Sequence, residues 1–468
     1  MTDEETNQQV KEIIMWWKLS LTVAFVLSAG MGGSNVLAGH EQYLASADKG
    51  APRLAQSIIH TSVLEPDTLY HKVWQLITED FYDPDKLKDA RWQRWEHKYD
   101  GKLKNMDDAH LAIETMLASL DDRYTRFLDR DAFDDEKSQI DARLFGIGVQ
   151  IGVDKNHRII VIAPIEGTPA SRAGLMPADE IFEINGKSTK GWTVEEAAKQ
   201  IRGEINTEVK LTLLRGKDKI KVVVTRAEIP IKAVQTAKIL DGNVGYVRLG
   251  SFISQQATKE MRESIANVTT LGAKGIILDL RDNPGGLLTN AIDISNMFLD
   301  KGNIVSTVDR DGYKTSAPSD GKPLCRLPLV VLINKGSASA SEITSGALRD
   351  NGRATLVGQT TYGKGLVQGI NRLEDGSGVN ITIARYLTPN DTDINKKGIG
   401  PDVAVTLNDQ DYKDGKGEWW LDPQGPITKR SPEDMKDVQL KAALDVVHKK
   451  LDGNDNAVAL KAQAPSKN

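Results

Sequence analysis

The strongest constraint on the fold is an alternation of apolar strands and amphipathic helices in the second half of the chain. Strands are expected at residues 275–280 and 329–333, and helices at residues 255–268 and 341–348. This alternation is typical of a layered α/β core, in which helices cover a sheet. Because functional residues in such cores follow the strands, we expect the site in the loops of residues 229–408.

The remainder of the 468-residue chain has different patterns of apolar residues and turns, so an α/β multidomain protein is predicted. Residues 39–141 carry apolar side chains at helical spacing and are expected to form an N-terminal helical domain. Residues 142–228 contain short β-rich runs separated by Gly, Pro and Asn-Gly turns, so a compact mixed domain is expected there. Residues 409–468 hold one expected helix at 435–450 and a polar tail.

Residues 1–38 have the pattern of an export signal. An apolar run at 19–27 follows Lys18 and leads through small residues to Ala38, as in a signal peptide with a small-residue cleavage site. Acidic residues outnumber basic ones before this run, and Trp16-Trp17 suits an interfacial anchor. An exported protein is therefore expected, either with a cleaved signal peptide or with a retained N-terminal membrane anchor.

Composition excludes several classes of function. The 60 Lys and Arg residues are scattered among 65 Asp and Glu residues, so the chain has no basic footprint for nucleic acid. The single cysteine, Cys325, has no intramolecular disulfide partner, and no Cys/His cluster has metal-ligand spacing. We expect no metal and no cofactor.

A candidate nucleophile follows the expected strand at 329–333. There the chain continues through Gly336-Ser337-Ala338-Ser339-Ala340 into a helix, an arrangement that places Ser339 beside free N–H groups at a helix N-terminus. The same residues support a structural reading, because Ser339 and Glu342 fit a capping box. This segment taken alone leaves both readings open.

The absence of histidine narrows the choice of base. None of the seven histidines lies in residues 229–407, so a serine nucleophile there has no imidazole within its own domain. Lys364 is the candidate base, because Tyr362-Gly363-Lys364-Gly365 allows close backbone approach and contains no other charge. Such a role requires burial that lowers the lysine pKa from ~10.4 to ~7. The alternative is an exposed turn with a solvated lysine.

A third segment, residues 278–286, is a strand that ends in Asn283-Pro284-Gly285-Gly286. Its glycines allow backbone amides to face a cleft, and Gly285 N–H together with Ala340 N–H would form an oxyanion hole. As a bare pattern the same residues also describe an ordinary turn.

Together these segments resemble the carboxyl-terminal processing peptidase family, in its photosynthetic, cyanobacterial or chloroplast-like branch. The similarity spans about residues 69–407 and is most specific at 336–342 and 362–365. It implies a crotonase/ClpP-like α/β serine protease core with no cofactor, with Ser339 as nucleophile, Lys364 as general base and Gln368 orienting the lysine. A straight strand would separate Lys364 and Gln368 by about 13 Å, so a bend between them is predicted.

The mixed domain resembles a PDZ domain inserted before this core. Its expected carboxylate-binding loop is formed by four consecutive residues, Phe145, Gly146, Ile147 and Gly148. The resemblance implies that a substrate C-terminus binds there by strand addition. Ala178 occupies a turn position where the family usually has glycine, at a cost of about 1 kcal/mol if φ is positive there. The segments 121–128 and 388–402 also match the family, and we interpret them as structural.

The resemblance predicts an enzyme of the periplasm or thylakoid lumen that removes C-terminal extensions from exported proteins, by Ser/Lys dyad catalysis. Its expected partners are protein substrates with exposed C-terminal tails, among them the precursor of a photosystem II reaction-centre protein. Two alternatives use the same fold: a non-catalytic binding scaffold with a PDZ domain, and an acyl-CoA enzyme of the crotonase type.

Overall fold

The computed structural model describes residues 65–453, apart from 89, 155, 166, 231, 421–431 and 433–435. The expected signal peptide or anchor at 1–38 and the end of the polar tail lie outside these residues. Within the described ranges, no helix combines the length and the apolar character that a bilayer span requires.

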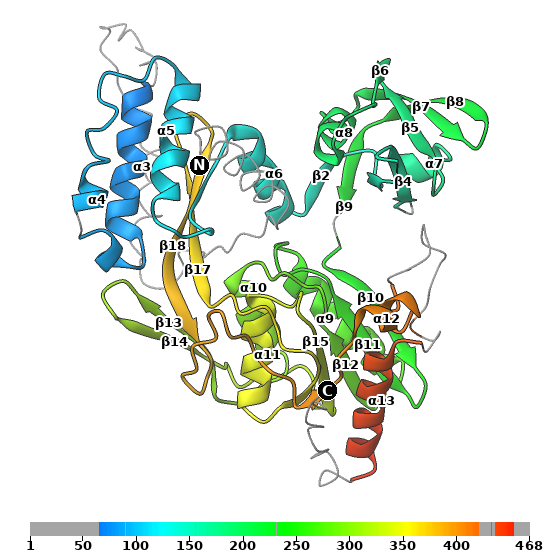
Figure 1. Ribbon diagram of the computed structural model, residues 1–468. Helices are drawn as coiled ribbons and strands as arrows, with labels where there is room; N and C mark the ends of the chain where they lie inside the picture. The colour runs from blue at the N-terminus through cyan, green and yellow to red at the C-terminus, as the bar shows by residue number, and fades with distance from the viewer. Residues whose placement is uncertain are drawn as a thin grey trace, which may run out of the picture.

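The N-terminal part of the described chain is helical, as predicted. Its apolar side chains recur at helical spacing and meet in a core that contains Trp92 and Trp95, both buried. The same core includes Val379 and Ile381 of strand β18, so these helices lie against the β17–β18 hairpin of the α/β core (Figure 1). The elements are α3 (Pro66–Asp80), η1 (Pro84–Lys86), α4 (Ala90–Gln93), α5 (Met106–Ala118), β1 (Arg126–Leu128) and α6 (Arg130–Ile140).

The mixed domain forms a separate body beyond α6 (Figure 1). Strands β3, β4, β5, β7 and β8 form its main sheet in that order, so β3 lies at one edge. Helix α8 begins with a capping box between Thr193 and Glu196. Its elements are β2 (Arg143–Gly146), β3 (Val149–Val153), β4 (Ile159–Pro164), α7 (Pro169–Arg172), β5 (Glu180–Ile184), β6 (Lys187–Ser188), α8 (Val194–Ile201), β7 (Glu208–Arg215), β8 (Asp218–Thr225) and β9 (Ala227–Pro230).

The α/β core is built on a sheet with the order β10-β11-β12-β15-β16-β19, parallel from β11 onward. Successive residues of its strands are buried on opposite faces, which explains their continuous apolar runs. One face packs against α9, α10 and α11, and the other against α13. The elements are β10 (Val234–Leu240), β11 (Val244–Leu249), α9 (Ala257–Thr270), β12 (Gly275–Asp279), α10 (Leu288–Asn296), β15 (Leu329–Ile333), α11 (Ala340–Asp350), β16 (Ala354–Gly358), β19 (Val403–Ala404), α12 (Asp409–Lys413) and α13 (Val438–Leu451).

A second sheet joins the core to the N-terminal helices. It runs β1-β18-β13-β14, and β17 also pairs with β18. Strand β1 pairs with β18 although the mixed domain and most of the α/β core lie between them in the sequence. The remaining elements are β13 (Asn303–Asp309), β14 (Lys314–Pro318), β17 (Leu366–Arg372) and β18 (Gly378–Leu387).

Candidate active site

Three loops meet at one edge of the central sheet. Gly285 follows β12, Ser339 follows β15 and Lys364 follows β16, and these strands are parallel neighbours in the sheet. Because the carboxyl ends of parallel strands lie at the same edge, the three loops converge although they are far apart in sequence. The expectation that the site lies in the loops after the strands is in agreement with this topology.

Ser339 occupies a strained backbone position directly before α11. Its φ of 65° and ψ of −114° lie outside the regions that L-residues normally adopt, at a cost of roughly 1–3 kcal/mol. The turn before it is held by Ser337, whose Oγ donates to Leu280 O at 2.8 Å and accepts the Asn334 N–H at 3.0 Å. These two hydrogen bonds fix the turn and so hold Ser339 in its strained conformation.

The Ser339 side chain is fully buried, and its Oγ makes no hydrogen bond within the described chain. The main chain of the same residue is bonded on both sides. Its N–H donates to Glu342 Oε2 at 2.7 Å, and its carbonyl accepts the Tyr386 hydroxyl at 3.2 Å. The Glu342 half of the expected capping box thus forms, while the serine hydroxyl itself remains available for chemistry.

Lys364 lies in a tight turn that only its glycine neighbours permit. A Cβ at Gly363, whose φ is +86°, would lie 2.8 Å from Gly398 N, and one at Gly365 would lie 2.9 Å from Asn395 N. The turn is covered in this way by residues 395–398, and 4% of the lysine surface is exposed. The alternative of a solvated lysine is therefore wrong.

Burial, together with the nearby Arg126 guanidinium, lowers the pKa of the Lys364 ammonium from 10.5 to about 7. The carboxylates of Asp122 and Glu136 act in the opposite direction. The Tyr124 ring covers the amine, with its centroid 4.6 Å from Nζ. A lysine with this pKa is half neutral near pH 7, as a general base at that pH must be.

Part of the lysine pocket comes from residues 121–128, which we had interpreted as structural. Arg126 of this segment forms an ion pair with the buried Glu136 at 2.9 Å, and Asn380 also donates to Glu136 at 3.1 Å. Sequence reasoning missed this role because the segment is far from the core in sequence. The only local signal is the density of charged and aromatic residues in a short loop.

Gln368 is buried on β17, and residues 363–368 do not form one regular extended strand; a bend that brings Gln368 to Lys364 stays a prediction. The strand begins only at Leu366, and its register with β18 shifts between Val367 and Gln368. Gln368 Nε2 donates to Thr382 Oγ1 at 3.4 Å, and Thr382 Oγ1 donates to Asp122 Oδ2 at 2.6 Å. Gln368 Oε1 has no hydrogen-bond partner among the described residues.

Glu342 joins the two halves of the site, which sequence reasoning did not anticipate. Its fully buried carboxylate accepts four hydrogen bonds, and burial raises its pKa. Oε2 accepts the N–H groups of Ser339 at 2.7 Å and Lys364 at 2.9 Å, so both backbone nitrogens contact the same oxygen atom. Oε1 accepts Thr361 Oγ1 at 2.5 Å and Gly363 N at 2.7 Å. One carboxylate thus sets the relative position of both loops.

Gly285 and Ala340 lie side by side, as an oxyanion hole would require. A Cβ built on Gly285 would lie 2.9 Å from both Ala340 N and Ser339 Cβ, so no larger residue fits there. No described acceptor receives the Ala340 N–H. The Gly285 N–H donates to Asn283 Oδ1 at 2.9 Å, so this second amide already has an acceptor.

The expected carboxylate-binding loop lies beside the edge strand β3. Gly148 has a φ of +75°, and a Cβ there would lie 2.4 Å from the Thr168 side chain, so glycine is required. Neither Ile147 N–H nor Gly148 N–H donates to an acceptor in the described residues. Ala178 has a φ of +66°, so the cost expected for alanine at this turn applies.

A buried ion network ties the C-terminal segment to the same sheet edge. Arg281, fully buried, forms ion pairs with Asp279 at 2.6 Å and Asp437 at 2.9 Å. Glu418 accepts from Asn334 at 2.7 Å, next to the turn that carries Ser339. Residues after 408 therefore contribute to the scaffold of the site.

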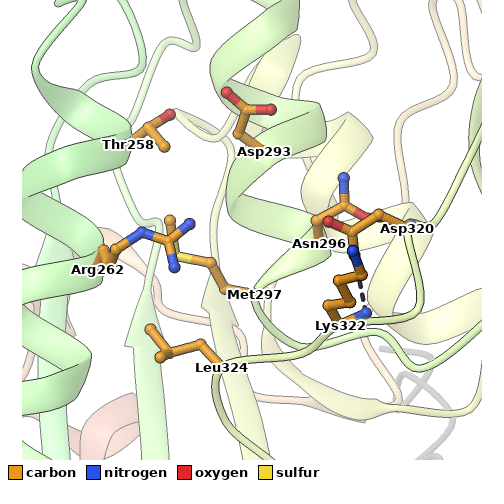
Figure 2. Close-up of a pocket in the computed structure, with 8 residues that line it drawn as sticks. All are labelled: Thr258, Arg262, Asp293, Asn296, Met297, Asp320, Lys322 and Leu324. Atoms are coloured by element: carbon orange, nitrogen blue, oxygen red, sulfur yellow. Dashed lines mark hydrogen bonds between the residues drawn. The ribbon is translucent and has the colours of Figure 1, made fainter.

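A separate surface hollow of about 220 Å³ lies between α9, α10 and the loop before β15 (Figure 2). It contains charged groups of both signs, and the figure shows the Arg262 guanidinium extending from α9 toward Met297. None of the predicted site residues lines it, so we assign it no part in the chemistry. Its lining residues are Thr258, Arg262, Asp293, Asn296, Met297, Asp320, Lys322 and Leu324.

Comparisons with known proteins agree with this geometry. Residues 243–405 match the model of peptidase family S41, and residues 136–214 match that of the PDZ domain. A solved structure of a photosystem II D1 C-terminal processing protease is 31% identical and covers 73% of this chain and 94% of its own, with a TM-score of 0.50.

The curated relatives are similar over most of their length. The carboxyl-terminal-processing protease of Synechocystis sp. is 40% identical over 348 residues, which cover 73% of this chain and 81% of the relative. The carboxy-terminal processing protease CtpA of Bacillus subtilis is 39% identical over 344 residues, or 72% of this chain and 69% of the relative. The chain therefore belongs to peptidase family S41, among the carboxyl-terminal-processing serine proteases.

Proposed function

We propose that Ser339 and Lys364 are the catalytic dyad of an endopeptidase that removes C-terminal extensions from exported proteins. The observation that carries this assignment is the shared Oε2 atom of Glu342, which accepts the backbone N–H groups of both residues and so holds them next to each other. The buried hydroxyl without a hydrogen bond and the lysine with a pKa of about 7 supply the matching chemistry.

In the proposed reaction the neutral Lys364 amine accepts the proton of the Ser339 hydroxyl, and the serine oxygen attacks a peptide carbonyl. The carbonyl oxygen becomes an oxyanion that receives a hydrogen bond from Ala340 N–H. The resulting ammonium returns its proton to the leaving amine as the peptide bond breaks. Water, deprotonated by the same lysine, then hydrolyses the ester and restores the serine.

Gly285 N–H is the second proposed oxyanion donor. Because this amide donates to Asn283 Oδ1, it must exchange that acceptor for the oxyanion when substrate is attacked. The exchange replaces one hydrogen bond by a stronger bond to a charged oxygen, so it favours the transition state over the resting enzyme.

Gln368 is proposed to orient the lysine from the bulged start of β17. Its Oε1, buried without a partner in the described chain, is a fitting acceptor for an ammonium proton formed during the reaction. The hydrogen bond to Thr382 fixes the amide orientation that this role requires.

Substrate choice is proposed to begin at the PDZ domain. Within the expected loop of residues 145–148, the backbone N–H groups of Ile147 and Gly148 are available for a C-terminal carboxylate, and the adjacent edge strand β3 offers a partner for an added strand. Tail-bearing proteins of the periplasm or thylakoid lumen fit this mode of binding, and the photosystem II reaction-centre precursor is one substrate to test. Membrane association through residues 1–38 belongs to the same proposal.

The decisive experiment compares wild type, Ser339→Ala and Lys364→Ala on a panel of tailed proteins, with the products read by mass spectrometry. Both variants should lose cleavage while they retain the wild-type fold by circular dichroism, and His157→Ala should cleave normally. Wild type should react covalently at Ser339 with an acyl-transfer probe. Turnover by Ser339→Ala would disprove the assignment of Ser339 as the nucleophile.

A further inference from the structure

Arg123 places an exposed guanidinium at the edge of the lysine pocket. One of its Nη atoms donates to the Tyr124 hydroxyl at 2.7 Å. Its Cζ lies 4.9 Å from the centroid of the Tyr124 ring and 5.3 Å from that of Tyr362. Two aromatic side chains therefore hold the cation in a defined place.

This cation has no acidic partner within the described ranges of the chain. Arg126, three residues later, shows the contrast, because it is paired with Glu136 at 2.9 Å. A guanidinium that is already oriented and has no counter-charge is ready to bind a carboxylate through two parallel hydrogen bonds.

The position of Arg123 relates it to the scissile bond. The Tyr124 centroid lies 4.6 Å from Lys364 Nζ and 4.9 Å from Arg123 Cζ, so one aromatic ring contacts both cations. The sum of these two distances is the largest separation that the two cations can have. Tyr362, 41% exposed, donates its N–H to Ser337 O at 3.0 Å, so this aromatic pair also borders the nucleophile turn.

An extended peptide, at ~3.3 Å per residue, covers that largest separation in about three residues. Because the base must pass its proton to the leaving amine, the fragment on the C-terminal side of the scissile bond begins close to Lys364 Nζ. We propose that Arg123 is a specificity-determining residue that binds a carboxylate located within about three residues on the C-terminal side of the scissile bond. This inference rests on the proposed roles of Ser339 and Lys364.

Two sources supply such a carboxylate: the α-carboxylate of a short leaving fragment, or an Asp or Glu side chain in a longer one. The test therefore uses peptides built on the tail that wild type trims fastest, cut to three residues beyond the scissile bond. One peptide ends in a free acid and one in an amide. Two longer, amidated peptides carry Asp or Asn at the third position.

The enzymes compared are full-length wild type, Arg123→Gln, Arg123→Lys and Arg372→Gln, a control at an exposed arginine at the end of β17. Wild type should prefer the acid over the amide, or Asp over Asn, by roughly 10- to 100-fold in kcat/KM, as expected for a charge-assisted pair. Arg123→Gln should remove that preference through KM. Because Arg123 also helps to lower the pKa of Lys364, the preference is read within each enzyme, as the ratio of kcat/KM between the acid and amide peptides and between the Asp and Asn peptides. Arg123→Lys should restore part of it, and Arg372→Gln should behave as wild type.

The inference is overturned if wild type cleaves acid and amide, and Asp and Asn, equally well. It is also overturned if Arg123→Gln lowers kcat/KM alike for every peptide and keeps the wild-type ratios of acid to amide and of Asp to Asn, because the arginine would then act only on the base. Labelling of Ser339 by an acyl-transfer probe distinguishes a failure of the role proposed for Arg123 from a failure of the proposed catalytic roles. Labelling with no carboxylate preference removes only the role of Arg123, whereas absence of both labelling and cleavage removes the proposed catalytic roles as well.

Discussion

Titration of the peptidase between pH 5.5 and pH 9 should reveal Lys364 as the group that controls turnover. With a pKa of about 7, roughly one tenth of the lysine is neutral at pH 6 and nine tenths at pH 8. We therefore expect kcat/KM to rise about tenfold over these two pH units and to level off above them. A lysine with a pKa of 10.5 would be neutral at pH 7 roughly a thousand times less often.

The lowered pKa of Lys364 also determines how the free energy of unfolding changes with pH. The native state holds this lysine with a pKa of about 7, and the unfolded chain holds it near 10.5, so the unfolded state binds more protons between these values. The contribution of Lys364 to the free energy of unfolding therefore rises with pH across that window. Below pH 7 the lysine is protonated in both states, and its burial costs about 5 kcal/mol.

Two assays should report the same inflection: kcat/KM on a tailed peptide, and the rate of Ser339 labelling by an acyl-transfer probe. Because histidine titrates in the same range, His110→Gln and His157→Ala serve as controls that should leave the curve unchanged. A curve that is flat, that inflects above pH 9, or that loses its inflection when a histidine is replaced would refute the role of Lys364.

Two further predictions concern buried carboxylates. Glu342→Gln leaves two of the four donors facing an amide NH₂ group, so we expect the free energy of unfolding to fall by about 2–6 kcal/mol in a urea titration. The rate of Ser339 labelling should fall as well, and unchanged labelling would mean that Glu342 does not position the dyad. Asp437→Ala leaves the buried Arg281 with the ion pair to Asp279 and the hydrogen bond to Gln439 Oε1, and about 3–5 kcal/mol should be lost in the same titration. A loss below about 1 kcal/mol would show that the C-terminal segment is not part of the scaffold.

Local sequence patterns were sufficient to predict helices and strands and to identify Ser339 and Lys364 as the candidate nucleophile and base. The strand at Leu329–Ile333 was predicted with the bounds that the structure has, because its continuous apolar run is contained in a short window. The small residues around Ser339 and the glycines around Lys364 likewise reflect backbone needs that act within a few residues, namely a left-handed φ and close packing.

The contribution of residues 121–128 could not be predicted in this way. Tyr124 reaches Lys364 because β1 pairs with β18, and no pattern within either segment specifies a partner so distant in the chain. Glu342 matched a common helix cap, and its sequence neighbours give no indication that the same oxygen also accepts the N–H of Lys364.

The residue types and their turns thus identified a serine and a lysine suited to acyl transfer, because these features depend on interactions between near neighbours. Whether the lysine is neutral depends on how much water surrounds its amine, and water is excluded there by side chains that the order of strands in two sheets brings together. The pKa of Lys364, and with it the proposed reactivity of Ser339, is a property of the assembled fold.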